Sequence, residues 1–357
     1  MIDIKFTPEK NGILVDEGNT FDVLFRASST ENDSTKKTQR LPLNLSIVID
    51  RSSSMQGQPL DEAKKCASML VDRMGEKDRL SIVMYGADAE VLVPSQPVTD
   101  KRKFKSQIDA IYASGMTALY DGWSLGAEEV AKNSHSNSIS RVLLLSDGQA
   151  NRGLVDEDVI SAHCQKMAEI GVSTSTYGLS EYFNENLMVG MASAGQGQAH
   201  YGQTAEDLLD PFQEEFDLLE AILSRRMRLR ILPEKGVSFE ILNGYSQDGE
   251  GRFILPDLAF GADVWALIQI KINSKICSQQ PETKLKILSA YIDYLDHDGV
   301  DQRSETAKLI IDLCTREQFA CLELDETVKS RATEVRAATL QEVAQVAARS
   351  ENWAKVD

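Results

Sequence analysis

The residues of this sequence best suited to chemistry are two acids and three hydroxyls near the ends of strand-like or helical runs. Asp50, Ser52 and Ser54 form a D-x-S-x-S segment at the end of the apolar run LNLSIVID, Thr117 closes the loop segment SGMT, and Asp147 follows RVLLLS. In an open α/β sheet, ligands bind beyond the carboxyl ends of the strands, so these side chains are expected at one edge of the sheet. Oxygen donors of this kind suit a hard cation such as Mg²⁺. The sequence therefore predicts a metal site built from these five residues.

The spacing of apolar residues predicts the elements that hold this site. Nearly continuous apolar runs, typical of strands buried on both faces, cover residues 43–50, 79–85 and 141–146. Helical spacing covers residues 60–74, 101–111, 119–132 and 156–170. This alternation indicates an α/β fold: an open, doubly wound, mostly parallel sheet with helices on both faces.

A different pattern surrounds the α/β region. Beyond residue 225, strand-like runs follow one another between turn signals such as Asn243-Gly244, which predicts an antiparallel β-sandwich. The strand-like N-terminal runs have no other partner, so we expect them to join this sandwich and the α/β domain to be inserted in it. The expected parts are sandwich strands at 1–40, the α/β domain at 41–224, the sandwich at 225–300 and a helical extension at 301–357.

The helical extension carries an apolar stripe. Val328, Ala332 and Val335 lie on one face of the helix predicted for residues 326–349. Because such a stripe usually packs on a core, we expect this helix to lie on the sandwich, with a second docking surface as the alternative.

The candidate site resembles the metal-ion-dependent adhesion site of von Willebrand factor A domains, also called integrin I domains. The resemblance rests on IVIDRSSSM around Asp50, SGMTALYDG around Thr117 and LLSDGQAN around Asp147, and it covers about residues 41–223. It implies one bound divalent cation, Mg²⁺ with Mn²⁺ or Ca²⁺ as alternatives, and a protein partner that supplies an Asp or Glu side chain to it. In this sequence a predicted sandwich follows the A domain, and this order is similar to that of bacterial intracellular members of the family.

The resemblance also implies a role for each residue. Ser52 and Ser54 would coordinate the cation through their hydroxyls, and Asp50 would do so directly or through a water molecule. Thr117 would move into or out of direct contact with the cation as a ligand binds or leaves. Asp147 would bind the cation mostly through water. In this family the last helix of the domain, here near residues 208–223, can move when ligand binds.

Composition bears on the class of partner and the compartment. The formal net charge is −17, and the basic stretches at 101–103 and 225–230 fit a helix start and a strand, so a nucleic-acid partner is not expected. No apolar run approaches the length of a membrane-spanning helix, so no membrane association is expected. The five cysteines are odd in number and lack CxxC spacing, which is typical of reduced thiols, and no secretory signal is visible at the N-terminus. We therefore expect a cytoplasmic protein.

An enzymatic role fits the sequence poorly. A hydrolase with Ser52 or Ser54 as nucleophile needs a nearby base, yet none of the four histidines follows a predicted strand with a partner acid. A phosphatase of the haloacid dehalogenase type, with Asp50 as nucleophile, would want a second Asp at position 52. The expected function is non-catalytic: metal-dependent protein recognition or scaffolding. A regulatory or recruiting subunit of an ATPase- or chelatase-type complex is the alternative, and a metal-dependent hydrolase is the less favoured one.

Overall fold

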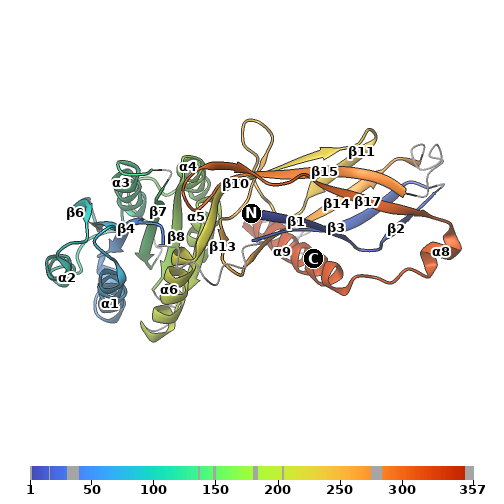
Figure 1. Cartoon of the computed structure of the whole chain (residues 1–357). Helices are drawn as coiled ribbons and strands as arrows, with labels where there is room; N and C mark the ends of the chain where they lie inside the picture. The colour runs from blue at the N-terminus through green and yellow to red at the C-terminus, as the bar shows by residue number, and fades with distance from the viewer. Residues whose placement is uncertain are drawn as a thin grey trace. The chain divides into compact units, whose positions relative to one another are not determined.

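The computed structural model divides the chain into two compact units, shown in Figure 1. It describes residues 2–15, 17–29, 40–135, 137–147, 150–179, 184–202, 205–274 and 284–349. The α/β unit contains the described residues from 40 to 222, together with 297–300. The sandwich unit contains the described residues up to 29, residues 223–296 and those from 301 onward. None of the described helices combines the length and the apolar character needed to cross a bilayer.

The α/β unit is built on a six-stranded sheet in the order β6-β5-β4-β7-β8-β9. Its strands are β4 (Leu43–Asp50), β5 (Arg79–Tyr85), β6 (Ala89–Pro97), β7 (Ile139–Ser146), β8 (Val172–Gly178) and β9 (Gln196–Tyr201). Neighbouring strands are parallel except for β6, which runs antiparallel to β5. Every residue of β4 and β7 is buried, as their continuous apolar runs predict. The predicted mostly parallel sheet is confirmed.

Helices cover both faces of this sheet (Figure 1). They are α1 (Gln58–Arg73), α2 (Lys101–Asp109), α3 (Leu119–Ala131), α4 (Glu157–Glu169), α5 (Glu185–Ala194) and α6 (Ala205–Glu220). Because strand residues alternate between faces, Leu45 and Ile47 of β4 join a core with α1, α2 and α6, whereas Val48 joins a core with α3, α4 and α5. The sheet is therefore doubly wound.

Helix α6 is fixed to the sheet by a buried carboxylate. Glu215 is only 2% exposed, and its Oε1 accepts a hydrogen bond of 2.6 Å from Arg141 Nη1. The hydroxyls of Ser175 and Tyr177 also donate to it, and His200 Nε2 lies 3.5 Å from Oε2. Burial by itself would raise the pKa of Glu215, but His200, the charge of Arg141 and the two hydroxyls lower it to about 2. Glu215 is therefore ionised at neutral pH.

Replacing Glu215 should destabilise the α/β unit strongly. Glu215→Gln leaves the buried guanidinium of Arg141 without a counter-charge, so we expect the free energy of unfolding to fall by about 3 kcal/mol. Urea denaturation at neutral pH measures this difference. The neighbouring Glu214 is exposed, so Glu214→Gln is the matched control and should leave the midpoint unchanged. A similar small effect for both variants would show that the buried pair does not hold α6.

The stabilising effect of Glu215 should also depend on pH. Its pKa is about 2 in the folded chain against a usual value of 4.5, so its ionised form stabilises the fold above pH 4.5 and this contribution is lost as the pH falls toward 2. We therefore expect the difference in unfolding free energy between wild type and Glu215→Gln to shrink by roughly half between about pH 6 and pH 3. A difference that stays constant over this range would contradict the assignment.

The sandwich unit consists of two sheets that share one core. The first sheet has the order β1-β3-β14-β11, with β1 (Ile2–Pro8), β3 (Asn19–Ser29), β14 (Asp263–Ile272) and β11 (Val237–Ile241). The second has the order β12-β10-β15-β17-β2, with β12 (Phe253–Ile254), β10 (Ile222–Pro233), β15 (Lys284–Leu295), β17 (Ala307–Cys314) and β2 (Gly12–Leu14). Two short strands, β13 (Leu258–Ala259) and β16 (Asp301–Arg303), pair with β10 and β15.

The N-terminal strands join the later part of the chain, as predicted. Strand β3 pairs antiparallel with β14 from Asn19 to Ser28, and β1 pairs with β3. Val23 and Phe25 of β3 then share a core with residues of the second sheet such as Leu229 and Ile292. The sandwich therefore combines strands that precede the α/β unit in the sequence with strands that follow it.

The structure differs from the sequence prediction at residues 301–314. These residues were expected in the helical extension, but they form β16 and β17, and β17 pairs with β15. Lys308 and Ile310 are exposed, and Leu309 and Ile311, which follow each of them, are buried. This alternation is typical of a strand with one face on a core. The helices begin only with α8 (Arg316–Ala320) and α9 (Glu326–Arg349).

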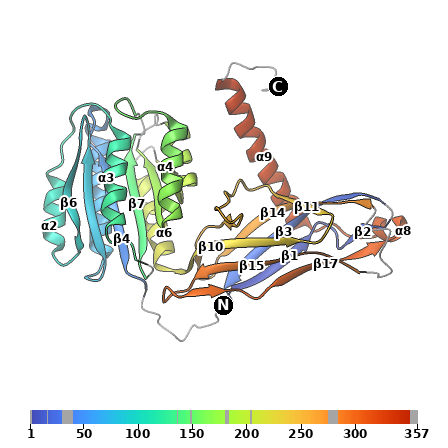
Figure 2. The same ribbon diagram turned by 90° about the horizontal axis from the view of Figure 1, so that it is seen from above.

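The first half of α9 packs on the sandwich, as its apolar stripe predicts. Val328 and Ala332 form a small core with Leu24 of β3 and Leu267 of β14, on the face of the first sheet opposite to the second sheet. Figure 2 shows α9 leaving this sheet toward its C-terminal end. Both faces of β3 are therefore covered, which accounts for the unbroken burial of its central residues.

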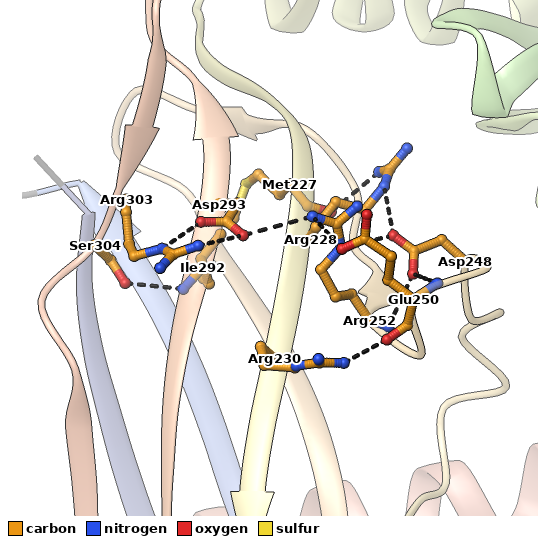
Figure 3. Close-up of polar contacts among 10 residues, drawn as sticks. All are labelled: Met227, Arg228, Arg230, Asp248, Glu250, Arg252, Ile292, Asp293, Arg303 and Ser304. Carbon is orange, nitrogen blue, oxygen red and sulfur yellow. Dashed lines mark hydrogen bonds and ion pairs between the residues drawn. The ribbon is translucent and has the colours of Figure 1, made fainter.

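Paired charges cover part of the second sheet (Figure 3). Asp248 closes a turn by accepting hydrogen bonds from the backbone N–H of Arg252 at 2.9 Å and from its Nε at 2.8 Å. On the neighbouring strands Arg303 Nε donates to Asp293 at 2.6 Å, and Arg228 Nε lies 3.9 Å from Asp248. The basic stretch 225–230 thus lies in β10, as its alternation predicts, and at least part of its charge is balanced locally.

Candidate metal centre

The D-x-S-x-S segment folds into a tight turn at the end of β4. Asp50 is the last residue of the strand, and its Oδ1 accepts a hydrogen bond of 2.8 Å from the backbone N–H of Ser52. A short 3-10 helix, η1, follows at Ser53–Met55, and the fully buried Met55 fixes it to the core. This turn places the hydroxyls of Ser52 and Ser54 3.0 Å apart. Three of the predicted ligands therefore lie together.

Two residues from neighbouring strands hold the Asp50 side chain. The hydroxyl of Ser146, at the end of β7, donates to Asp50 Oδ2 at 2.7 Å. The hydroxyl of Tyr85, at the end of β5, donates to Ser146 Oγ at 2.8 Å and lies 3.2 Å from Asp50 Oδ2. The sequence pattern alone pointed to neither residue. Their position at the ends of the strands on either side of Asp50 is the signal that could have found them.

The electrostatics of Asp50 favour a cation at this position. Burial raises the pKa of Asp50 to about 6, and the nearby charge of Asp147 adds to this effect, although hydrogen bonds from Ser52 and Ser146 oppose it. Burial also holds the pKa of Tyr85 well above its usual value, so the phenol stays a neutral donor. The described hydrogen-bond partners of Asp50 are thus neutral groups. A divalent cation at this edge would add a positive charge beside the carboxylate.

Thr117 reaches this edge on a loop that is bonded to the turn. The backbone N–H of Ser114 donates to the carbonyl of Arg51 at 2.6 Å, and that of Ser53 donates to the carbonyl of Gly115 at 3.0 Å. Gly115 has φ = +89°, a conformation that favours glycine. The side-chain oxygen of Asn151 accepts a hydrogen bond of 2.9 Å from the backbone N–H of Thr117. Thr117, 2% exposed, is held beside the D-x-S-x-S turn.

Asp147 completes the group of predicted residues. It directly follows β7, is 2% exposed, and raises the pKa of Asp50 through its charge. Residues 148 and 149 of the same motif, and 180–183 of the later stretch that resembles the family, lie outside the described residues. The structure therefore places Asp147 next to Asp50 at the carboxyl edge of the sheet.

The donor set is rich in hydroxyls and poor in acids. Within the described parts of the chain, no three His, Cys, Asp or Glu side chains gather in a way that could hold a metal ion by themselves. A cation at this edge would therefore depend on the hydroxyls of Ser52, Ser54 and Thr117 together with the carboxylates of Asp50 and Asp147. Oxygen donors with few carboxylates fit Mg²⁺, which retains water ligands.

Comparison with known proteins identifies the α/β unit. The family model of the von Willebrand factor type A domain matches residues 44–215. The chain contains a von Willebrand factor type A domain. The D-x-S-x-S turn and Asp147, which directly follows β7, both lie inside the matched region.

Relatives and solved structures extend this comparison beyond the A domain. The chain is 30% identical over 202 residues to the uncharacterized protein sll0103 of Synechocystis sp., a match that covers 55% of this chain and 46% of that protein. A von Willebrand factor type A protein from Catenulispora acidiphila is similar in structure, with a TM-score of 0.73 and 14% identity, over 98% of this chain and 82% of that one. The ArnB paralog VWA2 from Sulfolobus acidocaldarius has a TM-score of 0.60 and 17% identity, over 99% and 92% of the two chains. At such identities the two structures show a shared fold only, and the chain spans less than half the length of the Synechocystis relative.

The hydroxyl of Tyr85 should matter for cation binding by the A domain. Tyr85→Phe removes the donor that orients Ser146 against Asp50, and loss of such a supporting contact weakens metal binding by about tenfold or more. Electron paramagnetic resonance of free Mn²⁺ during titration measures the affinity. Tyr112→Phe removes the hydroxyl of a tyrosine that is 71% exposed and should leave the affinity unchanged. Equal affinities for the wild type and both variants would show that the Tyr85 hydroxyl does not position Asp50.

Proposed function

We propose that the A domain holds one divalent cation, Mg²⁺, through Asp50, Ser52, Ser54, Thr117 and Asp147, and uses it to bind a carboxylate of a protein partner. The observation that carries this proposal is the pair of buried carboxylates, Asp50 and Asp147, at one sheet edge beside two hydroxyls 3.0 Å apart. Two acids buried close together are unfavourable unless a positive charge offsets them. The site then works as a metal-ion-dependent adhesion site.

The composition of the donor set supports a partner carboxylate. Serine and threonine hydroxyls are neutral, so a cation that depends on them keeps more of its positive charge than one surrounded by carboxylates. An Asp or Glu from outside therefore finds a strong electrostatic partner there. The same oxygen donors would also accept Mn²⁺ or Ca²⁺.

The arrangement of Asp50 supports a binding role for this group. Each of its two carboxylate oxygens accepts at least one hydrogen bond, Oδ1 from Ser52 and Oδ2 from Ser146, and each oxygen keeps lone pairs for a cation or for a bridging water. These bonds fix the carboxylate before any ligand arrives. A site that is held in place in this way loses little conformational entropy when it binds.

We further propose that the site is not catalytic. A serine nucleophile needs an adjacent base, and the described side-chain partners of the Ser52 hydroxyl are Ser54 and Asp50. Within the described parts of the chain, no hydrogen bond joins either hydroxyl to a histidine or a lysine. Recognition of a partner, by scaffolding or recruitment, fits this chemistry better than hydrolysis.

Cation binding can be tested directly with the metal-stripped chain. We expect calorimetric titration with Mg²⁺ or Mn²⁺ to show one site in the wild type, and Asp50→Ala and Asp147→Ala each to weaken it by about a hundredfold or more, since each variant removes one of the two carboxylates. Asp109→Ala is the matched control, because Asp109 is an exposed acid at the end of α2 and lies outside the candidate site.

The outcomes separate the proposal from its alternatives. Loss of binding in the two site variants, with cooperative thermal unfolding retained in the chelated proteins, supports the site. The proposal fails if the wild type binds neither ion, or if Asp50→Ala and Asp147→Ala bind as the wild type does.

A further inference from the structure

The loop that carries Thr117 also presents two large apolar side chains to solvent. Tyr112 is 71% exposed and Met116 is 51% exposed, while the adjacent Ile111 is 2% exposed and lies in the core. Ile111 thus anchors the loop, and Tyr112 and Met116 project from it. Exposed apolar side chains beside a binding site are typical of surfaces that contact a partner.

Arg51 connects this apolar surface with the candidate metal centre. It stands between Asp50 and Ser52 in the D-x-S-x-S turn, and its guanidinium lies 5.7 Å from the ring centre of Tyr112. A cation over an aromatic face stabilises the position of both side chains. The Nε of Arg51 is buried and has no hydrogen-bond partner in the described part of the chain. We name the surface formed by Arg51, Tyr112 and Met116 the Tyr112 shelf.

Backbone contacts hold the shelf against the turn. Ser114, between Tyr112 and Met116, donates its backbone N–H to the carbonyl of Arg51 at 2.6 Å. Gly86 permits this approach, because a Cβ there would come within 2.6 Å of the Ser114 carbonyl and 3.6 Å of Arg51 Cγ. The shelf is therefore ordered in the free chain, and binding to it does not require a loop to become ordered first.

We propose that the Tyr112 shelf binds an apolar or aromatic side chain that directly flanks the metal-binding Asp or Glu of the partner. This proposal rests on the proposed function, and it adds the kind of segment that is recognised: an acidic residue with an apolar neighbour. The shelf is continuous with the site, because Arg51 belongs to the turn and Met116 precedes Thr117. The apolar neighbour removes Tyr112 and Met116 from water, which adds affinity that the carboxylate alone cannot supply.

Charge supports an acidic segment at this place. The chain carries a net charge of −17, which disfavours the approach of acidic segments to most of its surface. The guanidinium of Arg51, beside the cation, makes the shelf a local exception. An acidic and apolar segment therefore complements both properties of the shelf, whereas an apolar segment without an acid would use only one of them.

A displayed library of random heptapeptides tests the proposal. The full chain, immobilised in Mg²⁺, selects peptides that EDTA elutes, and sequencing gives the residues next to each acid. We expect the wild type to enrich Asp or Glu with an apolar or aromatic neighbour. The double variant Tyr112→Ser with Met116→Ser should bind the best wild-type peptide about tenfold or more weakly, with unchanged affinity for Mn²⁺ alone. Ile170→Ser is the matched control, since Ile170 is 56% exposed just before β8 begins, at the opposite edge of the sheet.

The outcomes distinguish the two proposals. If the selected peptides carry an acid with no preference for its neighbours, and the double variant binds them as the wild type does, the shelf is not a binding surface although the metal site stands. If EDTA elutes no acidic peptide from the wild type, or Asp50→Ala selects the same peptides, the metal-dependent function fails and the shelf proposal fails with it.

Discussion

The candidate centre depends on the hydrogen bonds that hold one buried carboxylate. Asp50 is opposite Tyr85 in the parallel register of β4 and β5, and Ser146 ends the strand on its other side. A shift of one residue in this register would turn Tyr85 to the opposite face and remove its hydroxyl from the carboxylate. Helix α3 must also leave room for the phenol ring, and a Cβ at Gly122 would come within 2.4 Å of it. Sheet register and a helix glycine together therefore fix the geometry of the site.

The buried pair on the other face of the sheet sets the position of α6. Burying Glu215 and Arg141 costs desolvation energy, and their mutual attraction recovers it only when the remaining hydrogen bonds are made, as they are through Ser175 and Tyr177. A helix held only by apolar contacts could slide with little change in energy. Displacing α6 instead separates a buried carboxylate from its partners, so any movement of this helix has to be coupled to a compensating gain elsewhere in the A domain.

The sequence was sufficient to predict the class of the fold, because buried parallel strands form continuous apolar runs whose ends mark the sheet edge. The structure brings the five candidate ligands to this edge, and their binding of a cation stays a prediction. The sequence did not indicate Tyr85 or Ser146, since a tyrosine or serine at a strand end has many uses and only the register brings both to Asp50.

Strand β6 contains Pro94, and β9 has the polar sequence QGQAHY, so neither shows a clear apolar alternation. Both are edge strands, which have a neighbouring strand on one side only, so a proline and polar residues are tolerated there. In β9, the backbone of Gly197 lies so close to β8 that a Cβ there would be 2.0 Å from the Thr174 carbonyl. Only the structure shows this close approach.

The proposed shelf follows from the charge balance of the site. The carboxylates of Asp50 and Asp147 together cancel the charge of a divalent cation, so the metal centre alone would be neutral overall and only locally electrophilic. Arg51 adds one positive charge within the same turn, and a partner carboxylate brings the local sum back to zero. Without Arg51, the same carboxylate would leave the centre with a net negative charge inside a chain that already carries −17. Arg51, which lies between the first two ligands of the motif, is therefore proposed to contribute to recognition through its charge. Its contact with Tyr112 places the apolar surface next to the metal site.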